Sequence, residues 1–412
     1  MESLVSGQVS PADVSTAELD EQPHEIFRRL RPITPLIRRQ DGTYVAIRAR
    51  DVERLITDPR TRQAETELPV SRGVTQGPLF MFFRHSMLFT NGPDHRRRRG
   101  PLSRTFAARL ISDLRPRIRA VADRLIDGVY ARGEMNLLDE YCARIPASII
   151  SEILGIPDAD IPHFTRWVYS MARSISPSFA RDDVPEIEVA AQHLAVYVTE
   201  LLASRRRAPQ DDFLTSYVKT LDEGGNLSAE EALSQMVTVI LAGSDTTRAA
   251  MAIQVSLLLQ HREQWDAVCQ DAALIPGAVA ESLRYEPSVG SVPRVTLEDI
   301  DIDGCVVPAG RFLSLSTMSA MRDPAVHADP DRFDIRRADQ ARRHLVFGNG
   351  SHRCLGEALA KAELEEGLAA LVTRLPQLRF VGDPPAVQGH GGIRRVSNMQ
   401  VRWAGKANAG AP

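Results

Sequence analysis

Cysteine is scarce in this chain, with four in 412 residues: Cys142, Cys269, Cys305 and Cys354. They lie far apart, and no two of them have the spacing of a CxxC motif. Structural zinc sites usually use such pairs, and small secreted domains need a denser set of cysteines to build a disulfide framework. The pattern therefore argues against both and favours a protein of the reducing cytoplasm.

Long apolar runs and a strong net charge are missing as well. No stretch reaches the roughly 18 apolar residues of a membrane-spanning helix, and residues 1–25 lack the apolar centre of a signal peptide. The formal net charge is -3 and the pI is near 6.4, so bulk electrostatics give no reason to expect nucleic acid as a partner. We expect a soluble, cytoplasmic protein without a membrane anchor or a nucleic-acid partner.

Apolar residues make up 43% of the chain, which is enough for a large core. Short β-like runs at residues 44–47 and 311–315 are embedded in a mostly helical chain, and Asp303-Gly304 is a typical hairpin turn. Residues 63–89 show weak periodicity and turn residues, which favours a loop over a site. The sequence predicts a mainly α fold with small β-sheets (α+β).

The two ends of the chain have little patterning. Residues 1–22 are predicted to form a loosely ordered lead-in, and residues 405–412, rich in Ala and Gly, a flexible tail. We expect neither end to carry chemistry.

The strongest helix signal begins at Ser228. Ser228 as N-cap and Glu231 three residues later make a capping box, and one unusually long helix is expected from there to about Gln260. Midway along it, residues 242–247 (AGSDTT) interrupt an apolar run with polar side chains and a glycine. Taken alone, this hexapeptide also fits the exposed face of a surface helix.

A decapeptide at residues 347–356, FGNGSHRCLG, places Cys354 between glycines just before a helix expected over residues 355–371. A sulfur at a helix start lies near the positive end of the helix dipole, where a thiolate is stabilised. The alternative is that Cys354 is a small, buried apolar residue, the commoner role for a lone cysteine.

The whole spacing Phe-Gly-x-Gly-x-His-x-Cys-x-Gly resembles the haem-binding loop of the cytochrome P450 family. The resemblance runs from about Pro23 to Trp403, with the family's motifs in the family's order. It implies the cytochrome P450 fold, a single haem-enclosing monooxygenase domain over residues 23–404 with a long central helix, although length alone would suggest two or three domains. It also implies haem b (iron protoporphyrin IX) ligated by the thiolate of Cys354.

By this resemblance the central helix carries the family's acid-alcohol pair, with Thr246 over the iron and Asp245 beside it. Cleaving dioxygen requires two protons; a hydroxyl can relay them from water, and a carboxylate can connect the relay to solvent. Ala242 and Gly243 are expected to lie against the cofactor, and the glycine to leave room for dioxygen.

A Glu-x-x-Arg pair, Glu281 and Arg284, shares one face of a further predicted helix. Apolar neighbours suggest that the pair is buried and needs further partners. The resemblance implies that Arg332 completes a structural triad that braces the cysteine loop.

Haem carries two propionates, which need cationic partners. By the resemblance, His95 and Arg99, four apart on one helix, and Arg294, after the Glu-x-x-Arg helix, are expected to contact the haem. Four residues of the cysteine loop are expected to contact it as well: His352, Phe347, Gly348 and Gly356. An exposed charged face is the alternative for His95 and Arg99.

Two surfaces follow from the resemblance. Side chains expected to line an apolar substrate pocket are Phe82, Phe83, Phe89, Val239, Val289 and Val292, although each of them also suits a simple core position. A basic patch suited to an acidic electron donor is expected at Arg353, Arg104 and Arg343, although such patches are also generic solubilising surface.

The implied activity is that of a haem-thiolate monooxygenase that activates dioxygen with two externally supplied electrons. It would hydroxylate, epoxidise or dealkylate a small to medium, largely apolar organic substrate. With no reductase domain fused, the expected partner of this monomer is an iron-sulfur ferredoxin, or a flavodoxin, served by an NAD(P)H-dependent reductase. A peroxide-dependent peroxygenase and a non-catalytic haem sensor or carrier are the alternatives.

Overall fold

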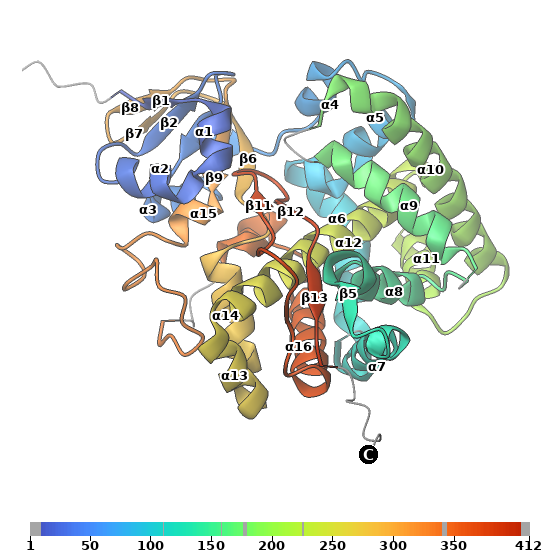
Figure 1. Cartoon of the computed structure of the whole chain (residues 1–412). Helices are drawn as coiled ribbons and strands as arrows, with labels where there is room; N and C mark the ends of the chain where they lie inside the picture. The colour runs from blue at the N-terminus through green and yellow to red at the C-terminus, as the bar shows by residue number, and fades with distance from the viewer. Residues whose placement is uncertain are drawn as a thin grey trace, which may run out of the picture.

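The computed structural model describes residues 10–109, 111–157, 159–175, 179–224, 226–339 and 344–404, and within 107–113 it describes no side chains. The predicted tail at 405–412 and the docking candidate Arg343 lie outside these residues. Long helices dominate the described chain, and its sheets are small, so the predicted fold class is confirmed (Figure 1).

The largest sheet contains six strands in the order β1-β2-β3-β9-β6-β4. The pairs β1–β2 and β3–β9 are parallel, and the other neighbours are antiparallel. The strands are β1 (Ala12–Val14), β2 (Leu36–Arg39), β3 (Tyr44–Ala46), β9 (Phe312–Ser316), β6 (Ser291–Thr296) and β4 (Thr61–Arg62). Beside this sheet in Figure 1 lie α1 (Thr16–Glu21), α2 (Pro23–Leu30), α3 (Ala49–Leu55) and α15 (Thr317–Ala320).

Part of the predicted lead-in is regular structure. Strand β1 pairs with β2, and α1 begins at a capping box in which Ser15 and Glu18 satisfy each other's backbone N–H groups. The Asp20 carboxylate also accepts a hydrogen bond from the buried His390 ring, at 2.7 Å. The prediction of loose order is therefore wrong for residues 12–21.

The remaining sheets are short. The predicted hairpin at Asp303-Gly304 joins β7 (Ile300–Ile302) to β8 (Cys305–Val307), and both turn residues have positive φ, 52° and 82°. A three-stranded sheet has the order β10 (Arg379–Phe380), β13 (Gln400–Arg402), β5 (Glu134–Asn136), and β11 (Val387–Gln388) pairs with β12 (Arg395–Val396).

Helix α12 (Ala229–Gln260) crosses the centre of the molecule, and other helices pack around it (Figure 1). It has the predicted bounds and the predicted capping box at Ser228 and Glu231. The other long helices of the helical part are α6 (Gly92–Arg109), α7 (Ile111–Tyr130), α8 (Arg144–Ile153), α9 (Ile161–Ala172), α10 (Val184–Arg207), α11 (Phe213–Gly224), α13 (Arg262–Gln270), α14 (Ile275–Tyr285) and α16 (Glu357–Arg374).

The segment predicted as a loop, residues 63–89, is largely helical. It contains α4 (Glu67–Ser71), α5 (Gly77–His85) and a 3-10 turn over Met87–Phe89. Leu79, Phe82 and Phe83 of α5 are buried in the main apolar core. Packing against that core stabilises a helix too short to be marked by its sequence pattern.

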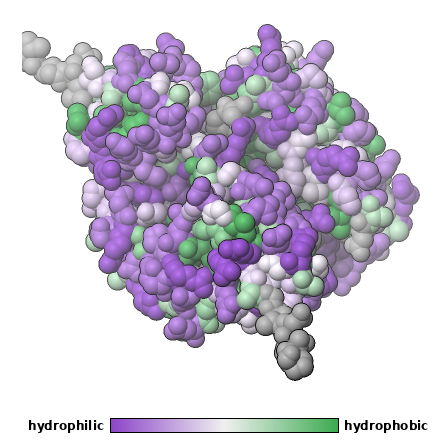
Figure 2. All heavy atoms as spheres, viewed as in Figure 1, coloured by the Kyte–Doolittle hydropathy of each residue, from purple (hydrophilic) through white to green (hydrophobic). Residues whose placement is uncertain are grey.

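The face of the molecule seen in Figure 2 is mostly hydrophilic, with small, scattered hydrophobic areas. None of the helices in the described part of the chain combines the length and apolar character that crossing a bilayer demands.

Candidate active site

The middle of α12 is accessible although the helix is otherwise buried there. Val239, Ile240 and Leu241 are buried, whereas Ala242 is exposed and Thr246 is partly exposed. A helix at the centre of a fold gains such an accessible stretch only where a hollow adjoins it. Ala242 and Thr246 therefore border open space, which we call the hollow.

The acid-alcohol pair lies on this stretch. The Thr246 hydroxyl donates a hydrogen bond to the Ala242 carbonyl, at 2.8 Å, so its oxygen remains able to accept another. One Asp245 carboxylate oxygen lies 2.5 Å from the Arg248 guanidinium. Successive helical side chains point about 100° apart, so the carboxylate and the hydroxyl leave the helix in different directions.

Gly243 has a packing role in this structure. A Cβ atom at this position would lie 2.7 Å from Cδ1 of Ile150, which belongs to α8. The missing side chain thus allows α8 and α12 to approach closely, and the space at Gly243 that we expected dioxygen to use is taken by Ile150.

The cysteine loop is a compact turn. Gly348 and Gly350 have φ values of +68° and +63°, a region that side chains with a Cβ rarely adopt. The Cys354 N–H donates to the Phe347 carbonyl at 2.7 Å and closes the loop, while the Phe347 ring is buried. Cys354 itself is accessible. The loop therefore presents its sulfur to open space.

The start of α16 does not by itself hold a thiolate at Cys354. The helix begins at Glu357 with Gly356 as N-cap, two residues later than predicted. Although Cys354 keeps accessible surface, it lies deep in the protein, and the resulting loss of hydration raises the pKa of its thiol against the opposing effect of a hydrogen bond from the Gly356 N–H. The expected stabilisation by the helix dipole is therefore outweighed, whereas a metal ion bound to the sulfur would favour the thiolate.

Four predicted propionate ligands gather beside this loop. The rings of His95 and His352 lie 3.9 Å apart, and Arg99 donates to the Arg353 carbonyl at 2.5 Å. Burial, with the nearby His95, Arg294 and Arg99, lowers the pKa of His352 to about 3. The pKa of His95 falls to about 4, because of burial and then of Arg99.

This cluster has no negative partner of its own. In the described part of the chain no carboxylate forms an ion pair with Arg99 or Arg294, and the buried Nε2 of His95 has no hydrogen-bond partner. Arg294 is 4% exposed, and burial lowers its pKa to about 10. At these pKa values the two histidines are neutral, so the positive charge of the cluster comes from Arg99 and Arg294. The Arg294 guanidinium donates to Gln63 Oε1 and to the Pro293 and Ile56 carbonyls, but no described carboxylate balances its charge. A buried cation and an orphaned ring nitrogen are costly unless an anion joins them. The cluster therefore fits the two propionates of a haem.

The Glu-x-x-Arg pair is buried, as predicted, but its third member is not Arg332. Glu281 is 0% exposed and binds Arg284 through two hydrogen bonds of 2.8 Å. The second cation on Glu281 is Arg337, whose Nε lies 3.3 Å from Oε1. Nothing in the motif's spacing separates Arg337 from Arg332 or Arg336, so the sequence offered no signal for the choice.

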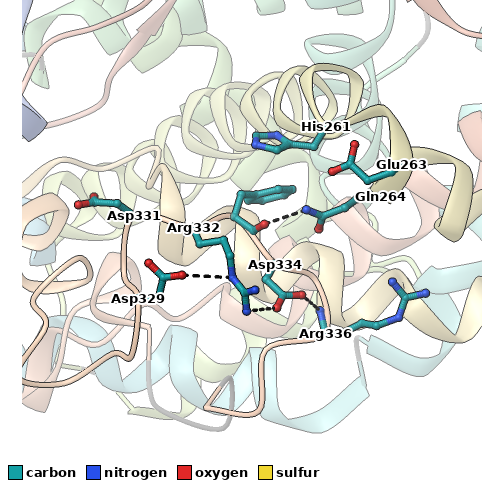
Figure 3. A pocket seen from close by; sticks show the side chains of 9 residues that line it. His261, Glu263, Gln264, Asp329, Asp331, Arg332, Asp334 and Arg336 are labelled. Carbon is teal, nitrogen blue, oxygen red and sulfur yellow. Dashed lines mark hydrogen bonds and ion pairs between the residues drawn. The ribbon is translucent and has the colours of Figure 1, made fainter.

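Figure 3 shows where the Arg332 side chain goes. It lies between Asp329 and Asp334 at a surface pocket of about 640 Å³, and it is 64% exposed. Only its backbone carbonyl takes part in the triad, since it accepts from both Arg284 and Arg337. The assignment of the Arg332 guanidinium to the triad is therefore wrong.

The residues predicted to line the substrate pocket differ in accessibility. Phe82, Phe83 and Val239 are buried, and Phe82 and Phe83 pack edge to face. Phe89, Val289 and Val292 keep accessible surface. Side chains that line an open hollow remain accessible, so the latter three fit the pocket wall, and the buried residues fit the core behind it.

The predicted docking residues form no shared cluster that the structure describes. Arg104 is exposed on α6. The Arg353 guanidinium is held at 2.5 Å by Glu357, one turn along the chain. The docking role of these residues stays a prediction.

Sequence reasoning missed Glu363, a buried carboxyl group on α16. It is 1% exposed, its Oε1 has no hydrogen-bond partner, and the Thr247 side chain of α12 lies beside it. A signal existed, because Glu363 is four residues from both Leu359 and Gly367 and so lies on the buried face of α16. Burial raises its pKa to about 8, against the opposing effect of Thr247.

Glu363→Gln should make the protein less sensitive to alkaline pH. Between its ordinary value of 4.5 and the folded value of about 8, the folded protein keeps a proton that the unfolded chain has lost. The contribution of Glu363 to the free energy of unfolding is therefore fully present below pH 4.5. It falls as the pH rises from 4.5 and is lost above pH 8, a total loss of about several kcal/mol at most. Urea unfolding at pH 5, 7 and 9 should show the advantage of the glutamine variant growing with pH. Parallel profiles, or the same gain in Glu366→Gln on the same helix, would contradict this.

Three features define the class of protein, one that encloses an acidic, metal-containing cofactor. They are the accessible stretch of α12 with its hydroxyl and carboxylate, the loop that presents a cysteine sulfur, and the cluster around Arg294 that lacks an anion. The chain matches the cytochrome P450 family over residues 163–376. It belongs to the cytochrome P450 family and is a monooxygenase of that family.

The comparisons extend over almost the whole chain. It is 45% identical over 397 residues to the plant-inducible cytochrome P450-pinF1 of Rhizobium radiobacter, covering 96% of this chain and 94% of the relative. It is 33% identical over 405 residues to the cytochrome P450 monooxygenase PikC of Streptomyces venezuelae, covering 94% and 92%. The crystal structure of myxobacterial cytochrome P450 CYP267B1 in complex with myristic acid matches with a TM-score of 0.85 and 32% identity, covering 94% of this chain and 98% of that one. The P450 fold is thereby confirmed.

Proposed function

We propose that this P450 inserts oxygen into a small to medium, largely apolar organic molecule, by hydroxylation, epoxidation or dealkylation. Two electrons come from a ferredoxin or flavodoxin that an NAD(P)H-dependent reductase serves, and the enzyme works as a cytoplasmic monomer. When bound, haem supplies the oxidative chemistry, and the Cys354 thiolate donates electron density to it.

The chain's own residues supply binding and proton delivery. His95, Arg99, Arg294 and His352 hold the propionates. The Thr246 hydroxyl passes protons into the hollow, and Asp245 connects that hydroxyl to solvent. Phe89, Val289 and Val292 give an apolar wall, and myristic acid, bound by the related CYP267B1, is a first probe of it.

The observation that carries the proposal is the accessible stretch of α12 that bears a hydroxyl and a carboxylate on adjacent residues. A peroxygenase that takes its oxygen from peroxide needs no such relay, and neither does a sensor or carrier. Product formation from peroxide without any electron donor would favour the peroxygenase. Absence of product-coupled NAD(P)H oxidation with any ligand would favour the sensor or carrier.

The first experiment is the carbon monoxide difference spectrum of the reduced protein and of Cys354→Ser. The wild type should show the strongly red-shifted Soret band of thiolate-ligated haem, and the serine variant should lose it. A band typical of histidine-ligated or thiol-ligated haem, or the absence of haem from the wild type, would remove Cys354 as the thiolate ligand.

A further inference from the structure

Arg248 is held between two other helix side chains, those of Asp245 and Tyr169. Its Nη2 atom lies 2.5 Å from Oδ1 of Asp245, one turn earlier on α12. Its Cζ atom lies 4.7 Å from the ring centre of Tyr169, which belongs to α9. The Tyr169 hydroxyl donates to the Ala143 carbonyl at 3.0 Å, just before α8 begins, so the ring itself is fixed.

This arrangement differs from an ordinary exposed ion pair on a helix, which contributes little to stability. The Asp245 side chain is 15% exposed and that of Arg248 is 30% exposed. The buried Oδ1 of Asp245 accepts no hydrogen bond of good geometry among the described residues, so its described partner is the positive charge of Arg248, whose Nε is likewise without a hydrogen bond. A cation over an aromatic face is stabilised by the ring, and more strongly when it is shielded from water.

We propose that Arg248 is a positioning residue for Asp245: clamped against Tyr169, it fixes the direction of the carboxylate and restricts, without closing, its contact with solvent. Tyr169 thereby links α9 to the proton relay. Only the effect of Arg248 on turnover rests on the proposed function. The positioning of the Asp245 carboxylate can be tested without any reaction.

The direct test is carbodiimide labelling of Asp245 in the haem-loaded protein, quantified by mass spectrometry. Arg248→Leu should raise labelling at least fivefold, and Tyr169→Leu should raise it by a smaller factor. Arg248→Lys keeps a cation and Tyr169→Phe keeps the ring, so both should remain within twofold of the wild type. The matched control is Arg119→Leu, which breaks a 3.1 Å helical pair with Asp123 on α7.

Equal Asp245 labelling in the wild type and Arg248→Leu would overturn the proposal. The same rise in Arg119→Leu would also overturn it, because it would indicate general loosening. A rise confined to the Arg248→Leu and Tyr169→Leu variants, with rescue by lysine, would support it.

The consequence for turnover is tested by a double-mutant cycle with NAD(P)H oxidation in the presence of myristic acid as readout. Arg248→Leu should slow oxidation three- to tenfold in the wild-type background and not at all in Asp245→Asn. An undiminished effect in Asp245→Asn would show that Arg248 does not act through Asp245. An Asp245→Asn variant as active as the wild type would instead contradict the relay in the proposed function, and the labelling result would still decide the positioning.

Discussion

Glu281→Ala is expected to purify with less than a tenth of the wild-type haem content. Glu281 is fully buried and accepts from Arg284, from Arg337 and from the Asp334 N–H. Its removal strands two guanidinium groups whose side chains are 4% and 6% exposed. Breaking a buried pair in this way costs about 3–5 kcal/mol, a large part of the stability of a typical domain.

The ratio of haem absorbance to protein concentration measures this effect, and urea unfolding measures the accompanying loss of stability. Two arginine variants make the test specific to the observed triad. Arg337→Ala should also lose haem, whereas Arg332→Ala, whose side chain is 64% exposed, should resemble the wild type. Near-normal haem in Glu281→Ala, or an Arg332→Ala variant as damaged as Arg337→Ala, would refute the assignment.

Thr246→Ala should uncouple electron consumption from product formation. NAD(P)H oxidation should continue within about threefold of the wild-type rate, while product per NAD(P)H falls at least fivefold and hydrogen peroxide accumulates. The physical reason is that alanine keeps the helix but removes the one hydroxyl of the accessible stretch that can pass protons into the hollow. Thr246→Ser, which restores a hydroxyl, should recover most of the coupling.

Ser244 provides a matched control on the same helix. Its hydroxyl donates to the Ile240 carbonyl at 2.8 Å, the same bond that Thr246 makes to Ala242, but Ser244 is 2% exposed. Ser244→Ala therefore removes an equivalent helix contact without touching the hollow, and its coupling should be unchanged. If Thr246→Ala stays fully coupled, or if Ser244→Ala uncouples equally, the role given to Thr246 is wrong.

The sequence predicted correctly the features whose structure depends on residues close together in the chain. The capping box at Ser228 and Glu231 fixed the start of α12, and Asp303-Gly304 fixed a hairpin because its backbone needs positive φ. The cysteine loop was recognisable since its glycines and Phe347 are close in sequence.

The errors concern contacts between distant segments. Arg337 and Arg332 both lie in a segment without helix or strand, and the path of that segment decides which side chain reaches Glu281. The sequence could not predict this path, because Glu281 lies more than fifty residues away. Gly243 was misread because its neighbour across the helix interface, Ile150, is far away in sequence. The order of residues 12–21 depends on pairing with β2 and on His390.

Arg284 of the triad also determines the shape of a long irregular segment. Residues 321–339 form turns and bends without a helix or strand, and their carbonyl groups at Met321, Pro330 and Arg332 accept from Arg284. The shape of this segment is thus imposed by a side chain of α14, which is distant in sequence. These contacts join residues 37 to 48 positions apart, so the segment keeps this shape only while α14 lies beside it. The cysteine loop, which follows the segment in the chain, therefore depends for its support on a helix that is distant in sequence.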